Sequence, residues 1–262
     1  MGLGALLALY AGTVLVACAS YRKLLYPAPN AGPLVIPEGA ELFALRAADG
    51  VPVHALYFPA PEGRPTVVHF HGNGETIGDG AWLSTPLRAR GFGVLLVEYR
   101  GYGVSRGEPP IVPSEDGLYR DAAAALDALE RRGVSFDRTV LWGTSLGTGV
   151  AAEMALRGRG SAVVLAAPYT SIRALASRYA PFLPIPLIVQ ERFDTLEKAP
   201  KIRVRVLVVH GSEDEVIPVA MGKKVASALP HGTLVVVRGG HHNDLFAVDP
   251  SLFEAMARFI EG

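Results

Sequence analysis

The sequence predicts an α/β fold with a mostly parallel central sheet of about eight strands and helices on both faces. Helix-like segments alternate with short apolar runs, and this alternation is typical of such sheets. The runs are rich in β-branched residues and continuously apolar, as expected for strands buried on both faces. They cover residues 66–70, 94–99, 139–142, 162–167, 204–210 and 233–237.

The length and composition fit one large α/β domain. A chain of 262 residues can bury one large α/β core, and we find no internal repeat and no second domain. Lys plus Arg and Asp plus Glu balance at 25 each, without a basic run, so we expect no nucleic-acid partner. The single cysteine, Cys18, excludes an intramolecular disulfide. The oligomeric state cannot be inferred from the composition.

The N-terminus differs from the rest of the chain. Residues 2–20 carry no charge and are followed by Arg22 and Lys23. At about 1.5 Å per helical residue, this segment can span a hydrocarbon core. We therefore expect residues 1–20 to be a membrane anchor or signal segment and the protein to be membrane-associated. "LVAC", ending at Cys18, resembles a lipobox, and residues 17–19 fit a cleavage pattern, so anchoring, cleavage and lipidation all stay open, as does the membrane side.

The elements of the domain follow in order along the chain. Residues 21–40 are rich in Pro, Ala and Gly and predict a linker, so the folded α/β domain is expected over 41–262. Asp49-Gly50 joins two strand-like runs and indicates a leading antiparallel hairpin. Ser114 is the expected N-cap of a helix over 114–132. The other expected helices cover 80–90, 146–157, 219–229 and 250–260.

One segment interrupts the alternation of strands and helices. Between the runs at 162–167 and 204–210, the stretch 178–194 contains three prolines among large apolar residues, which excludes a regular strand or a long helix. It is either an irregular connection packed on the sheet or a short cap. In a cap, side chains such as Phe182 and Leu183 would line the substrate cleft.

The pattern Gly143-Thr144-Ser145-Leu146-Gly147 matches G-x-S-x-G, in which a strained strand-to-helix turn exposes the serine hydroxyl. Because glycine is frequent in this chain, the context decides. A strand-like run precedes Ser145 and a helix-like segment follows it, so Ser145 is expected at the carboxyl edge of the sheet. This position favours a nucleophile.

A serine nucleophile needs a base and an acid, and both follow in chain order at strand ends. The run at 204–210 leads into Glu213, Asp214 and Glu215, and the run at 233–237 leads into His241 and His242. We expect the acid and the base among these residues.

The oxyanion donors are expected at two backbone N–H groups. Leu146 begins the helix after Ser145, where the helix dipole favours negative charge. Asn73 follows the first central strand, and Gly74 is the second choice there. Gly72 and Gly74 would let the backbone approach the substrate oxygen closely.

Other chemistries fit the sequence poorly. His69 and His71 form an H-x-H pair, but Asn73 and Gly74 stand where that metal-site pattern needs Asp and His. The glycines after the first central strand are spaced wrongly for a dinucleotide loop. Halide or epoxide chemistry on this fold would normally need a carboxylate at the position of Ser145, so the serine disfavours it. We therefore expect no metal and no cofactor.

Taken in order, "HFHGNGE", "VEYRGYGVSRGEP", "WGTSLGTG", "APYTSI" and "GGHHNDL" resemble the α/β-hydrolase superfamily of serine hydrolases over residues 40–260. The chain is similar to small, N-terminally anchored alpha/beta-hydrolase domain-containing proteins, a group that includes protein depalmitoylases. Serine peptidases of the prolyl oligopeptidase and aminopeptidase types share much of the same frame. The resemblance implies an α/β-hydrolase fold with a short cap.

The resemblance also selects among the candidate residues. The family's G-x-x-D-x-x-x-P pattern selects Asp214 as the acid, and its G-x-H-N pattern selects His242 as the base beside the nucleophile Ser145. A second histidine, His241, occupies the variable position of that motif. The remaining histidines, His54, His69, His210 and His231, are interpreted as packing or loop residues.

We expect an ester or thioester hydrolase acting on a small-molecule or lipid-like acyl substrate, because a membrane segment and an apolar stretch accompany the motifs. Amide hydrolysis by a serine peptidase of the aminopeptidase type is the alternative, since the same triad serves both. A non-catalytic, membrane-tethered binding module on the same fold is a third hypothesis.

Overall fold

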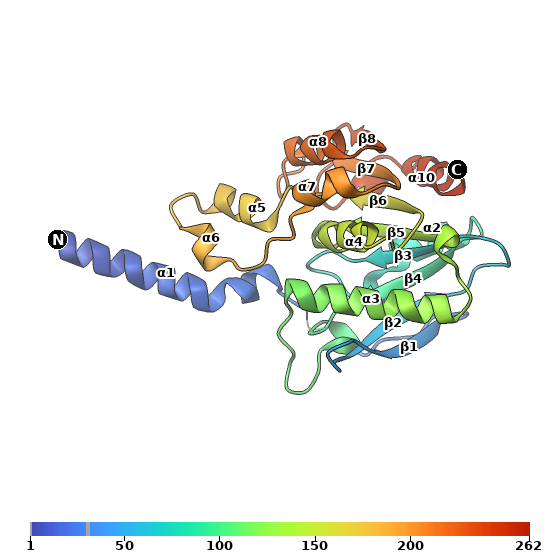
Figure 1. Cartoon of the computed structure of the whole chain (residues 1–262), viewed down its shortest axis with the longest axis horizontal. Coiled ribbons are helices and arrows are strands. Elements are labelled where there is room, and N and C mark those ends of the chain that lie inside the picture. The colour runs from blue at the N-terminus through green and yellow to red at the C-terminus, as the bar shows by residue number, and fades with distance from the viewer. Residues whose placement is uncertain (1, 30–31) are drawn as a thin grey trace.

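The computed structural model describes residues 2–29 and 32–262. Within them, eight strands form one sheet in the order β1-β2-β4-β3-β5-β6-β7-β8 (Figure 1). β2 pairs antiparallel with β1 and β4, and the other pairs are parallel, which confirms the predicted mostly parallel sheet. The strands are β1 (Glu41–Arg46), β2 (Pro52–Phe58), β3 (Thr66–Phe70), β4 (Gly93–Glu98), β5 (Thr139–Thr144), β6 (Ala162–Ala166), β7 (Arg205–Gly211) and β8 (Gly232–Val237).

The strands lie where the apolar runs predicted them, with shifts at their ends. Asp49-Gly50 lies in the turn of the leading hairpin, where the Ala47 N–H donates to the Val51 carbonyl at 2.9 Å. β4 covers 93–98 where we predicted 94–99. β5 continues past residue 142 to Thr144, so this buried strand leads directly into Ser145.

Helices cover both faces of the sheet. The apolar side chains of α3, α4 and α8 pack on one face, and those of α2 and α10 pack on the other. Successive strand residues alternate between these two cores, as the pleat requires; Val140 and Leu141 of β5 are an example. The helices are α1 (Leu3–Leu25), α2 (Ala81–Arg88), α3 (Glu115–Arg131), α4 (Leu146–Leu156), α5 (Ile172–Tyr179), α6 (Ile185–Ile188), α7 (Thr195–Lys198), α8 (Val219–Ala228), α9 (Leu245–Val248) and α10 (Leu252–Glu261).

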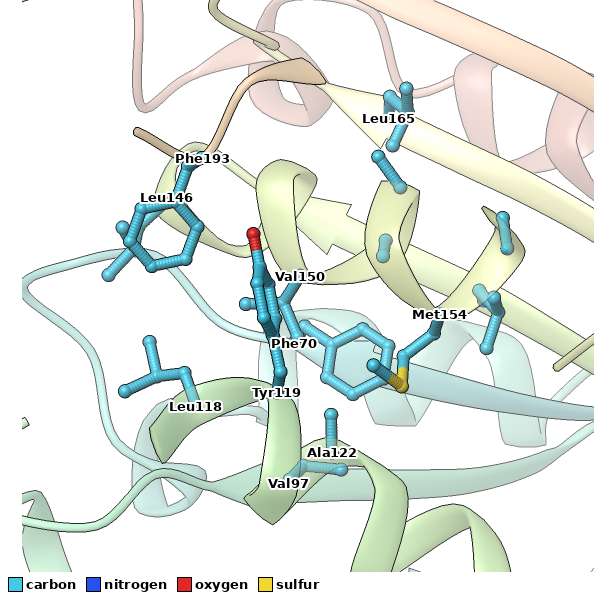
Figure 2. Packing of buried hydrophobic residues seen from close by; sticks show 14 of the residues in the cluster. Phe70, Val97, Leu118, Tyr119, Ala122, Leu146, Val150, Met154, Leu165 and Phe193 are labelled. Atoms are coloured by element: carbon cyan, nitrogen blue, oxygen red, sulfur yellow. The ribbon is translucent and has the colours of Figure 1, made fainter. Parts of the chain in front are cut away.

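α4 is a core helix, and it is the element that fixes the position of Ser145. Nine of its eleven residues are buried, between the sheet and α3. Figure 2 shows this packing, in which Val150 and Met154 of α4 lie close to Phe70 of β3. A helix enclosed in this way cannot shift without opening the core. The turn that precedes it is therefore rigidly held.

The proline-containing segment between β6 and β7 forms a short irregular cap. As predicted, it contains no strand and no long helix; α6 and α7 have four residues each. α5 begins with Ser171 as N-cap, whose hydroxyl accepts the Ala174 N–H at 3.1 Å. In Figure 1, α5 and α6 lie above the C-terminal part of α1. The cap therefore packs over the end of α1, where this helix meets the sheet domain.

The apolar N-terminal segment is a helix that extends away from the sheet domain (Figure 1). Among the described residues, α1 alone is long and apolar enough to cross a membrane. It continues past residue 20, where we placed the end of the segment, to Leu25. The predicted linker therefore begins as helix, because Tyr21 and Leu25 pack against the core and extend the last turn.

A buried ionic network ties the hairpin to the sheet and to α3. The Arg100 guanidinium, just after β4, lies 2.7 Å from a carboxylate oxygen of Asp121 on α3 and 2.6 Å from one of Asp49 in the hairpin turn. Asp121 also accepts the Arg100 backbone N–H at 2.9 Å. The Asp121 side chain is 0% exposed. Removing one partner would leave the other charge buried and incompletely paired.

We expect Asp121→Ala to lower the free energy of unfolding by about 3–5 kcal/mol, because it uncovers a buried guanidinium charge. Asp116 on the same helix is the matched control: it pairs with Arg120, but its side chain is 69% exposed. Asp116→Ala should cost about 1 kcal/mol or less. Urea unfolding of the full chain, followed by tryptophan fluorescence, measures both. Equal losses would show that the buried network does not hold the hairpin.

Candidate active site

Ser145 lies in a strained turn between β5 and α4. Its φ is 49°, a left-handed value that is unfavourable for a residue with a side chain. The Ser145 N–H donates to the Ala166 carbonyl of β6 at 2.9 Å, which holds the turn to the sheet edge. The strained strand-to-helix turn is the feature that the G-x-S-x-G pattern predicted.

The two glycines of the pattern are required by close backbone packing. A Cβ at Gly147 would lie 1.9 Å from the Phe70 carbonyl oxygen of β3. A Cβ at Gly143 would lie 2.3 Å from the Gly147 carbonyl oxygen. Both contacts are with backbone, so no side-chain movement could relieve them. The glycines therefore allow α4 to start tightly against the sheet, with Ser145 at its tip.

A histidine and an aspartate from two later loops align with Ser145. His242, after β8, places its Nε2 atom 3.0 Å from the Ser145 Oγ. Its Nδ1 atom lies 2.8 Å from Asp214 Oδ2, in the loop after β7. A carboxylate can only accept here, so Nδ1 carries the proton and Nε2 is free to accept one from the serine hydroxyl. The structure thus brings together three residues that lie far apart in the sequence.

The neighbouring candidates are placed differently. His241 is exposed, and its Nδ1 atom lies 3.2 Å from Glu215 rather than near Ser145. Its Nε2 atom lies 4.0 Å from Glu213. Of the two histidines and three acidic residues considered, His242 and Asp214 are the ones within hydrogen-bonding distance of the Ser145 arrangement.

The Asp214 carboxylate is held by several donors. Its Oδ1 atom accepts the backbone N–H groups of Val216 at 2.9 Å and Ile217 at 2.7 Å. Burial acts to raise the pKa of Asp214, but hydrogen bonds from His210, His242 and Ile217 outweigh it and hold the pKa well below its usual value. Asp214 therefore stays ionised at neutral pH and can orient the His242 ring.

His210 is a site residue that the sequence interpretation missed. Its ring is fully buried at the end of β7, with Nε2 2.7 Å from the Ile217 carbonyl and 3.3 Å from Asp214 Oδ2. Gly222 of α8 makes room for the ring, since a Cβ there would lie 2.3 Å from His210 Nδ1. The ring therefore braces the loop that carries Asp214. The sequence signal for this role was the position of His210, four residues before Asp214. Because His210 also ends a predicted buried strand, we interpreted it as a packing residue.

The loop after β3 lies beside Ser145 and is tightly bonded. The Gly72 N–H donates to Glu75 Oε2 at 2.8 Å, and the Tyr102 hydroxyl donates to Asn73 Oδ1 at 2.8 Å. The His71 ring packs against Tyr99, with ring centroids 4.2 Å apart. These contacts fix the path of the backbone past Ser145. Across the site, Leu146 is the first residue of α4, so its N–H has no acceptor within the helix.

The H-x-H pair is divided between two different structural roles. His69 Nε2 lies 3.1 Å from the hydroxyl of Thr144, the residue before Ser145. Burial lowers the pKa of His69 to about 3, so this ring stays neutral. His71 Nδ1 instead donates to the Gly72 carbonyl at 2.7 Å. Among residues 2–29 and 32–262, no group of three or more His, Cys, Asp and Glu side chains is arranged to hold a metal ion.

These residues face a cavity of about 690 Å³. Ser145 and His242 lie on its wall together with Gly72, Asn73 and Gly74. The remaining lining is mainly apolar and comes from α1, α2, α5, α9 and the loops around the site: Leu25, Trp82, Ile172, Leu175, Ile217, Leu245 and Phe246 are among these residues. A cavity of this size and character suits a small apolar ligand with a few polar contacts.

The cap residues that we predicted to contact substrate do not line this cavity. Phe182 is 67% exposed and lies outside the lining, because it stands at the turn between α5 and α6. Leu183 instead lines a neighbouring apolar hollow between α1, α5 and α6. The cap contributes Ile172 and Leu175 of α5 to the cavity at Ser145 in their place.

A mostly parallel eight-stranded sheet, a strained serine turn at its carboxyl edge, and a histidine and an aspartate after the last two strands define an α/β-hydrolase. Comparison with known families agrees. A family model described as serine aminopeptidase S33 matches residues 61–193, and one described as TAP-like protein matches residues 185–262. The chain belongs to the α/β-hydrolase superfamily, and it is a hydrolase of that fold.

Related sequences cover most of the chain. An uncharacterized protein of Mycobacterium tuberculosis is 33% identical over 259 residues, which are 95% of this chain and 90% of that protein. Alpha/beta hydrolase domain-containing protein 17C of Mus musculus is 34% identical over 217 residues, which are 79% of this chain and 64% of that protein.

Solved structures share the fold at low sequence identity. An esterase of Rhodococcus is 20% identical with a TM-score of 0.65, over 84% of this chain and 98% of that chain. An esterase of Pyrococcus furiosus is 18% identical with a TM-score of 0.69, over 89% and 96%. A puromycin-hydrolyzing peptidase of Mycobacterium tuberculosis is 23% identical with a TM-score of 0.68, over 84% and 38%. These likenesses describe the fold and not the substrate.

We expect His210→Phe to slow the reaction of Ser145 with a fluorophosphonate about tenfold, which corresponds to about 1.4 kcal/mol, because the ring no longer donates to the Asp214 loop. His210→Gln keeps an N–H donor and should recover most of the rate. Labelling rates at a fixed probe concentration, with thermal unfolding of each variant, measure the effect. If the Phe and Gln variants react equally fast, the His210 donor does not position Asp214.

Proposed function

We propose that this chain is a membrane-associated serine hydrolase that cleaves acyl esters or thioesters through Ser145, His242 and Asp214. The observation that carries the proposal is the alignment of the His242 ring, 3.0 Å from the serine oxygen and 2.8 Å from the Asp214 carboxylate. With this geometry one imidazole can take the serine proton and later return it.

The first step forms an acyl-enzyme. His242 Nε2 accepts the Ser145 hydroxyl proton while Oγ bonds to the substrate carbonyl carbon, and the carbonyl oxygen becomes an oxyanion. When the tetrahedral intermediate collapses, the bond to the leaving oxygen or sulfur breaks and His242 gives its proton to the leaving group. Asp214 stabilises the imidazolium that exists between these events.

The second step releases the acid. His242 takes a proton from a water molecule, whose oxygen bonds to the acyl carbon and forms a second oxyanion. Collapse breaks the bond to Ser145 Oγ, which recovers its proton from His242. Both steps use side chains of this chain and water, and neither calls for a cofactor.

We assign the oxyanion donors to the backbone N–H groups of Asn73 and Leu146. Both residues line the cavity beside Ser145, one from the loop after β3 and the other from the start of α4. Gly72 and Gly74 on either side of Asn73 also line the cavity and would let the substrate oxygen come close to the backbone. Each such donor is worth roughly 3–4 kcal/mol of transition-state stabilisation.

The character of the cavity supports an acyl substrate. Side chains such as Trp82, Leu175 and Phe246 give the wall beyond Ser145 an apolar surface. Burial of a hydrocarbon chain there would supply binding energy of about 25 cal/mol per Å². The apolar helix α1 supports placement at a membrane, where lipid-like substrates are found.

One carboxylate favours amide hydrolysis as the second candidate function. Glu75 lines the same cavity, with its Oε2 atom on the Gly72 N–H. A free carboxylate oxygen in this position could bind the terminal ammonium group of a peptide. The family description of a serine aminopeptidase agrees with such a substrate. A purely binding function is disfavoured, because a module without catalysis has no need of an aligned serine, histidine and aspartate.

We expect a fluorophosphonate probe to form a single adduct on Ser145 of the full chain in detergent, because His242 activates that hydroxyl. Ser145→Ala should give no adduct, and Asp214→Asn should react about 10⁴-fold more slowly with the fold intact. Mass spectrometry locates the adduct, and circular dichroism checks the fold. A near-normal rate for Asp214→Asn would refute the assigned acid, and an unlabelled wild type would refute the hydrolase.

Turnover of matched substrates separates the two candidate functions. We expect a higher kcat/KM, relative to the uncatalysed hydrolysis rate of each substrate, for p-nitrophenyl acyl esters than for amino-acid p-nitroanilides, because the cavity is mainly apolar. Glu75→Gln should leave ester turnover within about threefold. If anilides are preferred, and if Glu75→Gln lowers their turnover selectively, the peptidase function replaces the esterase.

A further inference from the structure

A second hollow adjoins the catalytic cavity. It has a volume of about 360 Å³ and lies between α1, α5 and α6. Apart from Tyr21 and Tyr179, every side chain that lines it is aliphatic. Tyr179 turns its hydroxyl to the Val216 carbonyl at 2.7 Å, in the loop that carries Asp214. The lining residues are Ala17, Tyr21, Leu24, Leu25, Ile172, Leu175, Ala176, Tyr179, Ala180, Leu183, Ile185, Ile188 and Val189.

The hollow shares part of its wall with the cavity at Ser145. Leu25, Ile172 and Leu175 line both spaces, so the two are separated by no more than these side chains. One of the three, Leu25, is the last residue of α1. The N-terminal helix thus contributes to the wall of the catalytic cavity as well as to that of the hollow.

Polar contacts hold α1 in this position. The Arg22 Nε atom lies 3.0 Å from a carboxylate oxygen of Glu191, whose side chain is 2% exposed. Tyr10 donates from its hydroxyl to the Phe182 carbonyl of the cap at 3.1 Å. Tyr26, just after the helix, is buried in the main core. The ion pair between the buried Glu191 carboxylate and Arg22 fixes the spacing between α1 and the cap. These contacts therefore maintain the shape of the hollow.

We propose that the hollow between α1, α5 and α6 binds the distal part of the substrate's acyl chain, with α1 as one wall. This inference rests on the proposed acyl hydrolase function and assigns it a long-chain substrate. An extended hydrocarbon chain leaving Ser145 past Ile172 and Leu175 enters a space without charged groups. Each methylene buried there contributes about fourfold in affinity.

The acyl side of the substrate fits the hollow better than the leaving group does. The acyl chain stays covalently attached to Ser145 through both chemical steps, whereas the leaving group must depart after the first. The ion pair between Arg22 and Glu191 holds the helices around the hollow together. A space fixed in this way suits the acyl chain, which stays attached during both steps. The helix that could cross a membrane, α1, also forms part of that wall. The bound acyl chain would therefore lie next to the membrane, which is the source of acyl lipids.

The test uses full-length protein in mixed micelles and p-nitrophenyl esters from the C2 to the C16 acyl chain. Ala176→Trp fills the hollow from α5 and Ala17→Trp fills it from α1, and neither residue lines the catalytic cavity. We expect both variants to lower kcat/KM for C12–C16 esters at least tenfold and to leave C2 and C4 esters within about twofold. Equal kinetics for all chain lengths, or equal losses, would overturn the proposal.

Two controls sharpen the result. Leu187→Trp adds the same side chain on α6, at a residue that is 80% exposed and outside the lining, and should change neither short nor long esters. A second series of acetate esters with C4–C16 alcohols should respond equally in all variants. If Ala176→Trp lowers turnover of long alcohols instead of long acyl chains, the acyl assignment is wrong.

A binding measurement separates this proposal from the proposed reaction. Full-length Ser145→Ala should bind palmitate saturably, in competition with a fluorescent fatty acid at fixed detergent concentration, and adding Ala176→Trp should abolish that binding. Binding in a protein whose wild type cleaves no ester would refute the reaction and keep the site. No saturable binding, or binding unchanged by Ala176→Trp, would refute the site.

Discussion

The arrangement of this molecule depends on the close approach of the turn at Ser145 to the ends of β3 and β5. A Cβ at Gly147 would come within 1.9 Å of a β3 carbonyl, so α4 can begin where it does only because that residue has no side chain. The positive φ of Ser145 is the cost of this approach, and a fully packed α4 maintains it. The strained turn at Ser145 is thus held by the larger of the two hydrophobic clusters in the described residues.

The same constraint organises the chemistry around the serine. Parallel strands end at one edge of the sheet, so the loops after β3, β7 and β8 converge on the turn although they lie far apart in the sequence. Two of these loops are then fixed by local contacts: Asp214 by backbone N–H groups and His210, and Asn73 by the Tyr102 hydroxyl. Preorganised donors and acceptors of this kind lower the reorganisation needed during reaction.

The N-terminal helix connects the site to its proposed location. α1 is apolar enough for a bilayer, yet its last turns pack on the cap and supply Leu25 to the catalytic cavity. The N-terminal helix and the cavity at Ser145 are therefore structurally joined, and the ion pair between Arg22 and Glu191 holds α1 against the cap. If the substrate is an acyl lipid, it could move from the membrane to Ser145 along the apolar surface where α1 packs on the cap. The esterase and peptidase folds among its structural neighbours show that the sheet itself does not impose this choice.

The sequence by itself determined the alternation of buried strands and helices, because β-branched apolar runs and capped amphipathic segments are local properties. The G-x-S-x-G pattern also indicated Ser145, and the ends of the predicted strands limited the acid to residues 213–215 and the base to residues 241–242. The resemblance to the α/β-hydrolases then selected Asp214 and His242. The tertiary structure decided what depends on distant packing. The bracing role of His210, the exposure of Phe182 and the contribution of α1 to the cavity all arise from contacts between elements that are far apart in the chain. No local pattern encodes such contacts, because they depend on how the cap and α1 settle against the sheet domain.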